Sequence, residues 1–236
     1  DVDNFPEFPE VDEKKTIPIE LSVLKKLTLC SSFAVSKEDP RACLRGVFWE
    51  INQSRIGMAA TDGHRLGRSS FNQELDIEEN YSCIVSPKSL QHLLRIGGDD
   101  EKRIISVSIG EQYVLFEFDG FSFCSKLTEG PYPDYEKVIP EENPKNATID
   151  KNQLYEAVRR VSVLANKKTH LIKFTFTTAE LEIMVLNLDI GGEAHQKVPI
   201  DYEGENHIIG LNSAYLLEIL SIIDSPRIRF EMNTQI

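Results

Sequence analysis

The segment Ala60-Thr61-Asp62-Gly63-His64-Arg65-Leu66 places a carboxylate, a glycine, an imidazole and a guanidinium at consecutive positions between apolar residues. It follows a strand-like run, residues 55–60, and precedes a polar region. An Asp-Gly pair is typical of a tight turn, because glycine adopts positive φ without steric cost. Taken alone, the segment is explained equally well by a hairpin turn with solvated polar side chains and by a functional site.

A second motif, Gly130-Pro131-Tyr132-Pro133-Asp134-Tyr135, continues to Pro140 as G-x-Y-P-D-Y-x-x-V-x-P, roughly seventy residues further on. In this order the two motifs resemble those of the bacterial DNA polymerase III beta subunit, the DNA sliding clamp family. The resemblance covers essentially the whole chain and maps it onto the second and third domains of a three-domain protomer. It implies an α+β fold, the DNA clamp fold, with two tandem repeat domains that each pack two helices on antiparallel sheets.

The hydrophobic pattern itself indicates two copies of one unit. Strand-then-helix patterns occur at residues 17–31 and 149–168, and the expected helix caps Ser86 and Asn212 lie 126 residues apart. Ile19 matches Ile149 at an offset of 130, and Ile104 matches Ile228 at 124. The first copy also predicts a hairpin over residues 113–127.

These patterns give three segments. Residues 1–15 hold two prolines and six carboxylates and are predicted to be a linker or arm. Residues 16–143 are predicted to form the clamp's middle domain. Residues 144–236 are predicted to form its C-terminal domain, with the last hairpin missing. From this division we expect a monomer in dilute solution, or a contact through the strand at residues 228–232, and no closed ring from these residues alone.

Composition excludes several classes of protein. A hydrophobic fraction of 41% is adequate for packed cores, and no apolar run is long enough to span a membrane. The four cysteines, Cys30, Cys43, Cys83 and Cys124, show no zinc-ligand spacing and are expected to be reduced thiols. We therefore expect a cytoplasmic protein with no membrane contact, no cofactor and no metal site.

Net charge is −12, which by itself argues against nucleic acid as a partner. The four expected helices nevertheless carry +5 together, and the remainder of the chain carries −17. A basic set of helices on an acidic body is what a DNA-facing surface needs, although ordinary solvated helix faces also explain it.

The resemblance implies a partner-peptide-binding pocket, which in the family lies between the second and third domains. The positions in this chain that match it are Leu44, Thr61, Gly63, His64, Arg65, Leu66, Pro133, Lys137, Val138, Asn212 and Tyr215. Asp62 is expected to brace the turn. Thr169 stands where relatives often carry an aromatic residue, and Ala42 and Cys43 replace an aromatic DNA-contacting pair found in some relatives.

The function implied is that of a non-catalytic processivity factor in DNA replication, which encircles duplex DNA without reading its sequence. The expected DNA-facing residues are Lys25, Lys26, Lys88, Arg159 and Arg160. The expected partners are the replicative polymerase's catalytic subunit, the clamp loader, and other polymerases or repair proteins that carry short linear motifs. The full-length protein is expected to form a homodimeric ring.

Two other functions remain open from the sequence. A hydrolase or transferase would use Asp62 and His64 as an acid/base pair. Against it, the chain has no nucleophile elbow, no P-loop and no H-E-x-x-H motif. A generic pair of scaffold domains would use neither motif for a specific peptide.

Overall fold

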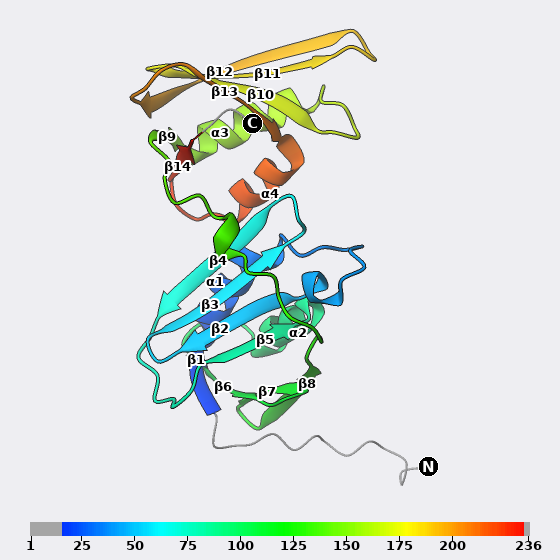
Figure 1. Cartoon of the computed structure of the whole chain (residues 1–236), viewed down its shortest axis with the longest axis vertical. Coiled ribbons are helices and arrows are strands. Elements are labelled where there is room, and N and C mark those ends of the chain that lie inside the picture. The colour runs from blue at the N-terminus through cyan, green and yellow to red at the C-terminus, as the bar shows by residue number, and fades with distance from the viewer. Residues whose placement is uncertain (1–15, 234–236) are drawn as a thin grey trace. The chain divides into compact units, whose positions relative to one another are not determined.

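The computed structural model describes residues 16–233 and divides into two compact units (Figure 1). Unit 1 spans Asp1–Tyr135 and unit 2 spans Glu136–Ile236. The boundary expected between residues 143 and 144 lies inside unit 2, just ahead of its first strand. The linker predicted for residues 1–15 lies outside the described residues.

Unit 1 contains two antiparallel sheets and two helices. Its first sheet has the order β1-β6-β7-β8 and its second the order β4-β3-β2-β5. The elements are β1 (Thr16–Glu20), α1 (Leu21–Ser32), the 3-10 helix η3 (Ala42–Arg45), β2 (Val47–Asn52), β3 (Arg55–Thr61), β4 (Leu66–Asn72), β5 (Tyr81–Val85), α2 (Pro87–Gly97), β6 (Ile104–Ile109), β7 (Tyr113–Phe118) and β8 (Phe121–Lys126).

The core of unit 1 follows from the periodicity of its strands and helices. Along β2, Val47, Trp49 and Ile51 are buried against the helices, and the alternate residues face the other side of the sheet. Helix α1 buries a stripe that includes Leu24 and Leu27 in the same core. Both sheets and both helices therefore share one apolar core.

Unit 2 contains one six-stranded antiparallel sheet, ordered β13-β10-β11-β12-β9-β14, and two helices. The long strand β12 pairs with β11 along most of its length and with β9 near its end, so it joins what are two separate sheets in unit 1. The elements are η4 (Glu136–Val138), β9 (Lys145–Asp150), α3 (Lys151–Ser162), β10 (Leu171–Phe176), β11 (Glu180–Asn187), β12 (Gly192–Tyr202), β13 (His207–Asn212), α4 (Ser213–Ile222) and β14 (Arg227–Met232).

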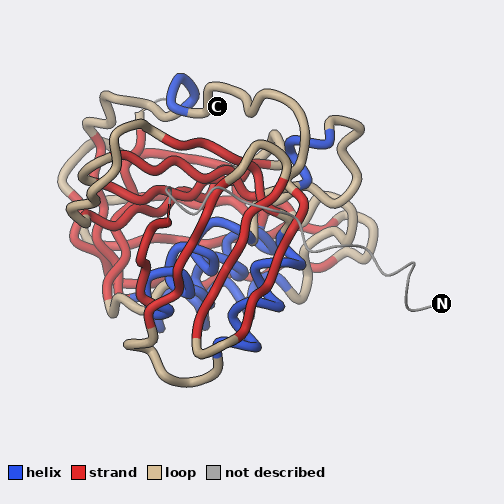
Figure 2. Tube along the Cα trace, turned by 90° about the horizontal axis from the view of Figure 1, so that it is seen from below, coloured by secondary structure: helices blue, strands red, loops and turns tan. Residues whose placement is uncertain are grey.

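The predicted repeat is confirmed. Elements β9 to β14 follow the same order as β1 to β6, with α3 and α4 in the places of α1 and α2 (Figure 1). Strands make up more of the trace than helices do (Figure 2). Asn212 caps α4 by accepting hydrogen bonds from the backbone N–H groups of Ala214 and Tyr215, at 2.9 and 3.2 Å. Ser86 occupies the matching place before α2 but makes no side-chain cap bond. In the described part of unit 2, no hairpin corresponds to β7 and β8.

One offset was wrong by a residue. Ile105 pairs with Ile19, and Ile228 pairs with Ile149, so the equivalent of Ile228 is Ile105 and not Ile104. Neighbouring residues of a strand face opposite sides, and a one-residue slip therefore exchanges the buried and exposed faces. Ile105 is fully buried, whereas Ile104 is 49% exposed.

Two strands were not predicted, and other predicted elements have different limits in the structure. Strand β4 was not predicted, because this edge strand carries polar residues that face solvent. Strand β13 was not predicted either, because only its end, Gly210-Leu211-Asn212, stands out ahead of α4. The hydrophobic run from Leu44 to Ile51 suggests a single strand, but β2 begins at Val47, since Leu44 belongs to η3. Helix α3 ends at Ser162, before the expected end at Lys168.

The contact between α1 and β4 leaves no room for a side chain at Gly67. A Cβ atom there would lie 2.9 Å from the carbonyl oxygen of Ser31 and 3.1 Å from that of Cys30. We expect Gly67→Ala to lower the free energy of unfolding by about 1–3 kcal/mol through overpacking, measured by urea denaturation. Gly57→Ala, in the adjacent strand, is the control, because its Cβ would meet nothing closer than 3.6 Å. Equal losses in both variants would contradict this account of Gly67.

Candidate functional site

The first motif forms the loop between β3 and β4, with Thr61 paired to Leu66 at its base. The Thr61 hydroxyl donates to the carbonyl oxygen of Arg65 at 2.7 Å and accepts from the Gly63 N–H at 3.1 Å. Gly63 has φ +84°, a conformation that side chains disfavour, which explains glycine at this position. We call residues 61–66 the β3–β4 loop.

The Asp62 carboxylate braces this loop, as expected. One of its oxygens accepts from the backbone N–H groups of His64 and Arg65 at 3.0 and 3.1 Å, and the other accepts from the Arg65 guanidinium at 3.1 Å. Burial acts to raise the pKa of Asp62, but these hydrogen bonds and the Arg65 charge outweigh it, so that the pKa lies below its usual value. Asp62 is therefore held as a charged structural group.

Arg65 links the loop to the end of helix α1. Its guanidinium donates to the carbonyl oxygen of Phe33 at 2.8 Å and lies 5.3 Å from the centre of the Phe33 ring. Phe33 is the C-cap residue of α1. The loop is thus fixed to the helix as well as to the sheet.

The second motif reaches the first through Tyr132. The Tyr132 ring stacks on Phe48 of β2, with centroids 4.8 Å apart and planes 7° from parallel. Its hydroxyl oxygen accepts the backbone N–H of Thr61 at 3.0 Å. Burial raises the pKa of Tyr132 to about 12, so the phenol remains neutral at physiological pH. Two motifs far apart in the sequence therefore meet at the carboxyl end of β3.

Tyr135 fastens the second motif to the same sheet. Its hydroxyl donates to the carboxylate of Glu50, and its ring meets Phe48 edge-on at 6.2 Å. The Arg68 guanidinium of β4 lies 5.7 Å from the centre of the Tyr135 ring. Residues 132–135 thus cover the face of the sheet that is turned away from the helices.

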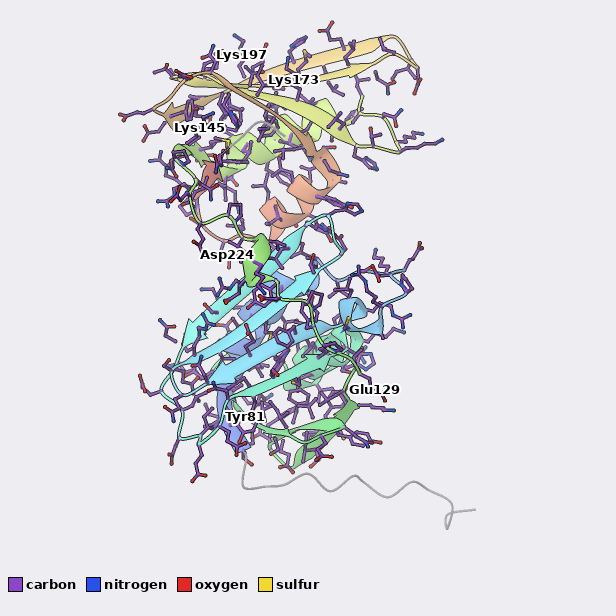
Figure 3. All side chains as sticks on the ribbon, in the orientation of Figure 1. Tyr81, Glu129, Lys145, Lys173, Lys197 and Asp224 are labelled. Atoms are coloured by element: carbon purple, nitrogen blue, oxygen red, sulfur yellow. The ribbon has the colours of Figure 1, made fainter. Side chains whose placement is uncertain are left out.

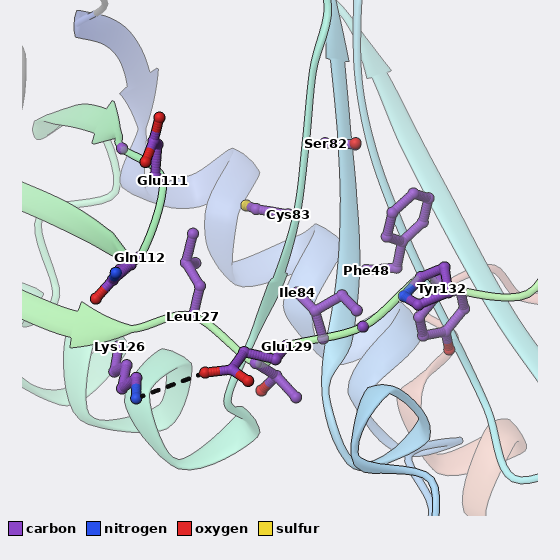
Figure 4. A pocket seen from close by; sticks show the side chains of 14 residues that line it. Phe48, Ser82, Cys83, Ile84, Glu111, Gln112, Lys126, Leu127, Glu129 and Tyr132 are labelled. Atoms are coloured by element: carbon purple, nitrogen blue, oxygen red, sulfur yellow. Dashed lines mark ion pairs between the residues drawn. The ribbon is translucent and has the colours of Figure 1, made fainter.

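A cavity of about 470 Å³ adjoins Tyr132 within unit 1 (Figure 4). Phe48, Ile84, Leu127 and Tyr132 are among its apolar lining residues. An ion pair between Lys126 and Glu129, at 3.8 Å, lies elsewhere along its wall (Figure 4).

The structure brings together six of the predicted pocket residues of unit 1: Thr61, Gly63, His64, Arg65 and Leu66 in the loop, with Pro133 next to Tyr132. Leu44 is only 1% exposed and packs with Cys43 and Ile84, and against Phe48 and Tyr132. Sequence reasoning missed Phe33 and Phe48. Alternation along β2 places Phe48 on the face opposite the core, which was the available signal.

The remaining predicted pocket residues belong to unit 2. Lys137 and Val138 lie in η4 and are exposed, and Asn212 and Tyr215 lie at the start of α4. The Asn212 side chain is engaged in capping that helix. Their part in partner binding stays a prediction.

The predicted DNA-facing residues all lie on helices and are exposed. Lys25 and Lys26 lie on α1, and Lys88 lies in the first turn of α2. On α3, Arg159 and Arg160 lie 2.8 and 3.8 Å from the carboxylate of Glu156, and Arg160 also bonds to Gln196. Both arginines keep more than half of their side-chain surface exposed, at 60% and 55%.

The acid/base hypothesis finds no support in this geometry. Both Asp62 carboxylate oxygens are engaged by the loop's own donors, and the bond to His64 is made by its backbone rather than by its imidazole. Residues 16–233 contain no cluster of three or more His, Cys, Asp and Glu side chains suited to holding a metal ion. None of the helices described is long and apolar enough to cross a membrane.

Comparison with known proteins gives the same family that the two motifs indicated. Residues 18–134 match the family model described as DNA polymerase III beta subunit, central domain, and residues 136–236 match the model of its C-terminal domain. The chain belongs to the DNA polymerase III beta-subunit family. The predicted family and the predicted DNA clamp fold are thereby confirmed.

Individual relatives show what share of a beta subunit's length this chain covers. The beta sliding clamp of Pseudomonas putida is 32% identical over 226 residues, which cover 94% of this chain and 61% of that protein. The crystal structure of the Pseudomonas aeruginosa sliding clamp with ligand superposes with a TM-score of 0.93 at 31% identity, over 99% of this chain and 63% of that one. The Bacillus subtilis clamp gives 0.91 at 30% identity, over 100% and 62%.

We expect Asp62→Asn to loosen the β3–β4 loop and to lower the free energy of unfolding by about 1–3 kcal/mol at neutral pH, because it removes a charge that three donors stabilise. The folded-state pKa of Asp62 is depressed, so its contribution is present above the unfolded-state pKa and disappears as pH falls through the folded-state pKa. Wild type and variant should therefore converge in acid, measured by urea denaturation across pH.

Asp119→Asn is the matched control for this prediction. Asp119 pairs with Arg103 at 2.9 Å but is 64% exposed, so its loss should cost about 0.5 kcal/mol or less. A loss at Asp62 no larger than at Asp119, or one that does not shrink in acid, would refute the brace.

Proposed function

We propose that this chain is part of a DNA sliding clamp, the non-catalytic processivity factor of a bacterial replicative DNA polymerase. The observation that carries the proposal is the contact between its two motifs, in which the Tyr132 hydroxyl oxygen accepts the backbone N–H of Thr61 at 3.0 Å. The chain spans 61% of the length of the P. putida beta sliding clamp. The activity of a whole clamp therefore belongs to the full-length protein.

The β3–β4 loop is the proposed partner-binding surface in unit 1. Its backbone and carboxylate groups are largely engaged within the loop, whereas the His64 side chain is exposed and Leu66 is half-buried. Such a surface suits a short peptide that supplies an apolar anchor and few polar contacts. We therefore propose polymerases, the clamp loader and repair proteins with short linear motifs as partners.

The exposed basic residues of α1, α2 and α3 are proposed to face duplex DNA in the assembled ring. Lysine and arginine side chains contact phosphates without reading base sequence, and such contacts are weak and sensitive to salt. Retention on DNA would then depend on the closed ring rather than on affinity. We place this activity in the cytoplasm.

Unit 2 exposes an apolar surface suited to assembly. Val163, Leu188 and Ile190 are 79%, 82% and 64% exposed, respectively, near the tip of the β11–β12 hairpin and the end of α3. The Asn187 side chain donates to the carbonyl oxygen of Leu164 at 3.0 Å and holds the two segments together. Exposed apolar patches mark protein interfaces, and we assign this one to the homodimeric ring of the full-length protein.

The partner-binding proposal is tested by titrating a synthetic peptide with glutamine, leucine and phenylalanine anchors onto the chain. We expect wild type to bind and His64→Ala to bind about tenfold more weakly, measured by calorimetry, because the exposed imidazole is one of the few polar groups free to orient the peptide. His92→Ala, an exposed histidine on α2, should bind like wild type.

Failure of the wild-type chain to bind would count against the partner-binding proposal. Binding that survives unchanged in His64→Ala would remove the loop from the binding surface. A generic scaffold pair or an enzyme predicts no preference for this peptide.

The DNA-facing proposal is tested in the full-length protein by reversing two charges on helix α3. Two charges on the face of the unit 2 sheet that is turned away from the helices are reversed as the control. Arg159→Glu with Arg160→Glu should weaken DNA association and reduce the slope of its salt dependence by about 2, one for each phosphate that an arginine no longer neutralises. Lys173→Glu with Lys197→Glu makes the same charge change on the sheet face away from the helices (Figure 3) and should have little effect. Equal effects of the two double variants would contradict the assignment.

A further inference from the structure

We propose that Tyr132 is the positioning residue of the partner-binding loop, in that its hydroxyl fixes the end of β3 and thereby the conformation in which the β3–β4 loop meets a partner peptide. This inference rests on the function proposed above. It gives the second motif the role of holding the first motif in its binding conformation.

The pairing between β2 and β3 stops at Phe48 and Ala59, two residues short of Thr61. The register that pairs Phe48 with Ala59 would place Gly46 opposite Thr61, but β2 begins at Val47. Gly46 instead directs its N–H to the carbonyl oxygen of Cys43, which closes η3. The Tyr132 hydroxyl oxygen takes the place of a strand partner and accepts the Thr61 N–H at 3.0 Å.

The position of this hydroxyl is set by apolar packing. The Tyr132 ring lies nearly parallel to Phe48, whose place is fixed on β2, and it packs against the small cluster of Cys43, Leu44 and Ile84. On another side the ring borders the cavity of about 470 Å³ (Figure 4). The stacked ring thus holds its hydroxyl oxygen at the point where the Thr61 N–H meets it.

Thr61 passes this constraint to the rest of the loop. Its side-chain oxygen contacts both the Gly63 N–H and the Arg65 carbonyl oxygen, at 3.1 and 2.7 Å. A fixed Thr61 backbone thus fixes the turn from which His64 and Leu66 project. A loop that is already in its binding conformation loses less conformational entropy when a partner binds, so its affinity is higher.

The test compares Tyr132→Phe with Tyr135→Phe in the chain of residues 1–236. Each variant removes one tyrosine hydroxyl from the same motif and keeps the ring, but the Tyr135 hydroxyl bonds to Glu50 of β2, whereas the Tyr132 hydroxyl bonds to Thr61. The probe is the synthetic peptide with glutamine, leucine and phenylalanine anchors. Peptide affinity, thermal unfolding and hydrogen exchange of the Thr61 and Gly63 amides are measured for each protein.

We expect Tyr132→Phe to weaken peptide binding about three- to tenfold, the effect of losing one hydrogen bond, and to speed exchange at Thr61 and Gly63. Tyr135→Phe should retain wild-type affinity even if it lowers the unfolding temperature. A purely structural role would instead make affinity follow stability in both variants.

Three results would overturn the inference: unchanged affinity in Tyr132→Phe, equal losses of affinity in the two variants, or unchanged exchange at Thr61 in Tyr132→Phe. If the wild-type chain bound no peptide, the proposed function would fail, and the exchange rates at Thr61 would still decide whether Tyr132 positions the loop.

Discussion

The carboxylate of Asp62 is the point on which the candidate site depends. A partly buried charge is stable only when donors surround it, and here two backbone N–H groups and a guanidinium converge on it. The guanidinium belongs to Arg65, which also reaches the Phe33 carbonyl oxygen at the end of α1. One charged group therefore shapes the loop and ties the sheet to the helix behind it, while Tyr132 holds the loop from the other side.

The repeat shows how one fold supports two kinds of surface. The β3–β4 loop of unit 1 and the β11–β12 loop of unit 2 occupy the same place in the order of strands. In unit 1 this place holds charged and polar residues that are fixed by internal hydrogen bonds. In unit 2 it holds Leu188 and Ile190, both well exposed. The core pattern is common to both units, and the loop sequence decides whether the surface suits a small peptide or a broader apolar interface.

The sequence was sufficient where periodicity or turn chemistry was strong. The helices, the hairpin over residues 113–127 and the repeat followed from apolar spacing and from capping residues such as Asn212. Strand β4 could not be predicted because an edge strand with a solvated face lacks an apolar signal. The match of Ile104 with Ile228 as equivalent positions of the two repeats was wrong because Ile104 and Ile105 are neighbours in sequence. Only the hydrogen-bonded register shows which of the two is buried.

The contact between the two motifs lies beyond what sequence alone provides. The motifs were identified by resemblance, but nothing in their spacing shows that a tyrosine hydroxyl meets the Thr61 N–H. That bond depends on where β2 ends and on Phe48 lying on the outer face of the sheet. Tertiary contacts of this kind join residues through packing, which a linear pattern does not record.

We propose that the full-length protein holds DNA by encircling it, and retention on circular and on cut duplexes tests this proposal. The full-length protein would be loaded onto nicked circular DNA by its clamp loader, washed at high salt to remove phosphate contacts, and the DNA then cut once. We expect the protein to stay on the nicked circle through the wash and to leave when the circle is cut open. Equal retention on circular and cut DNA, or loss from both during the wash, would contradict it.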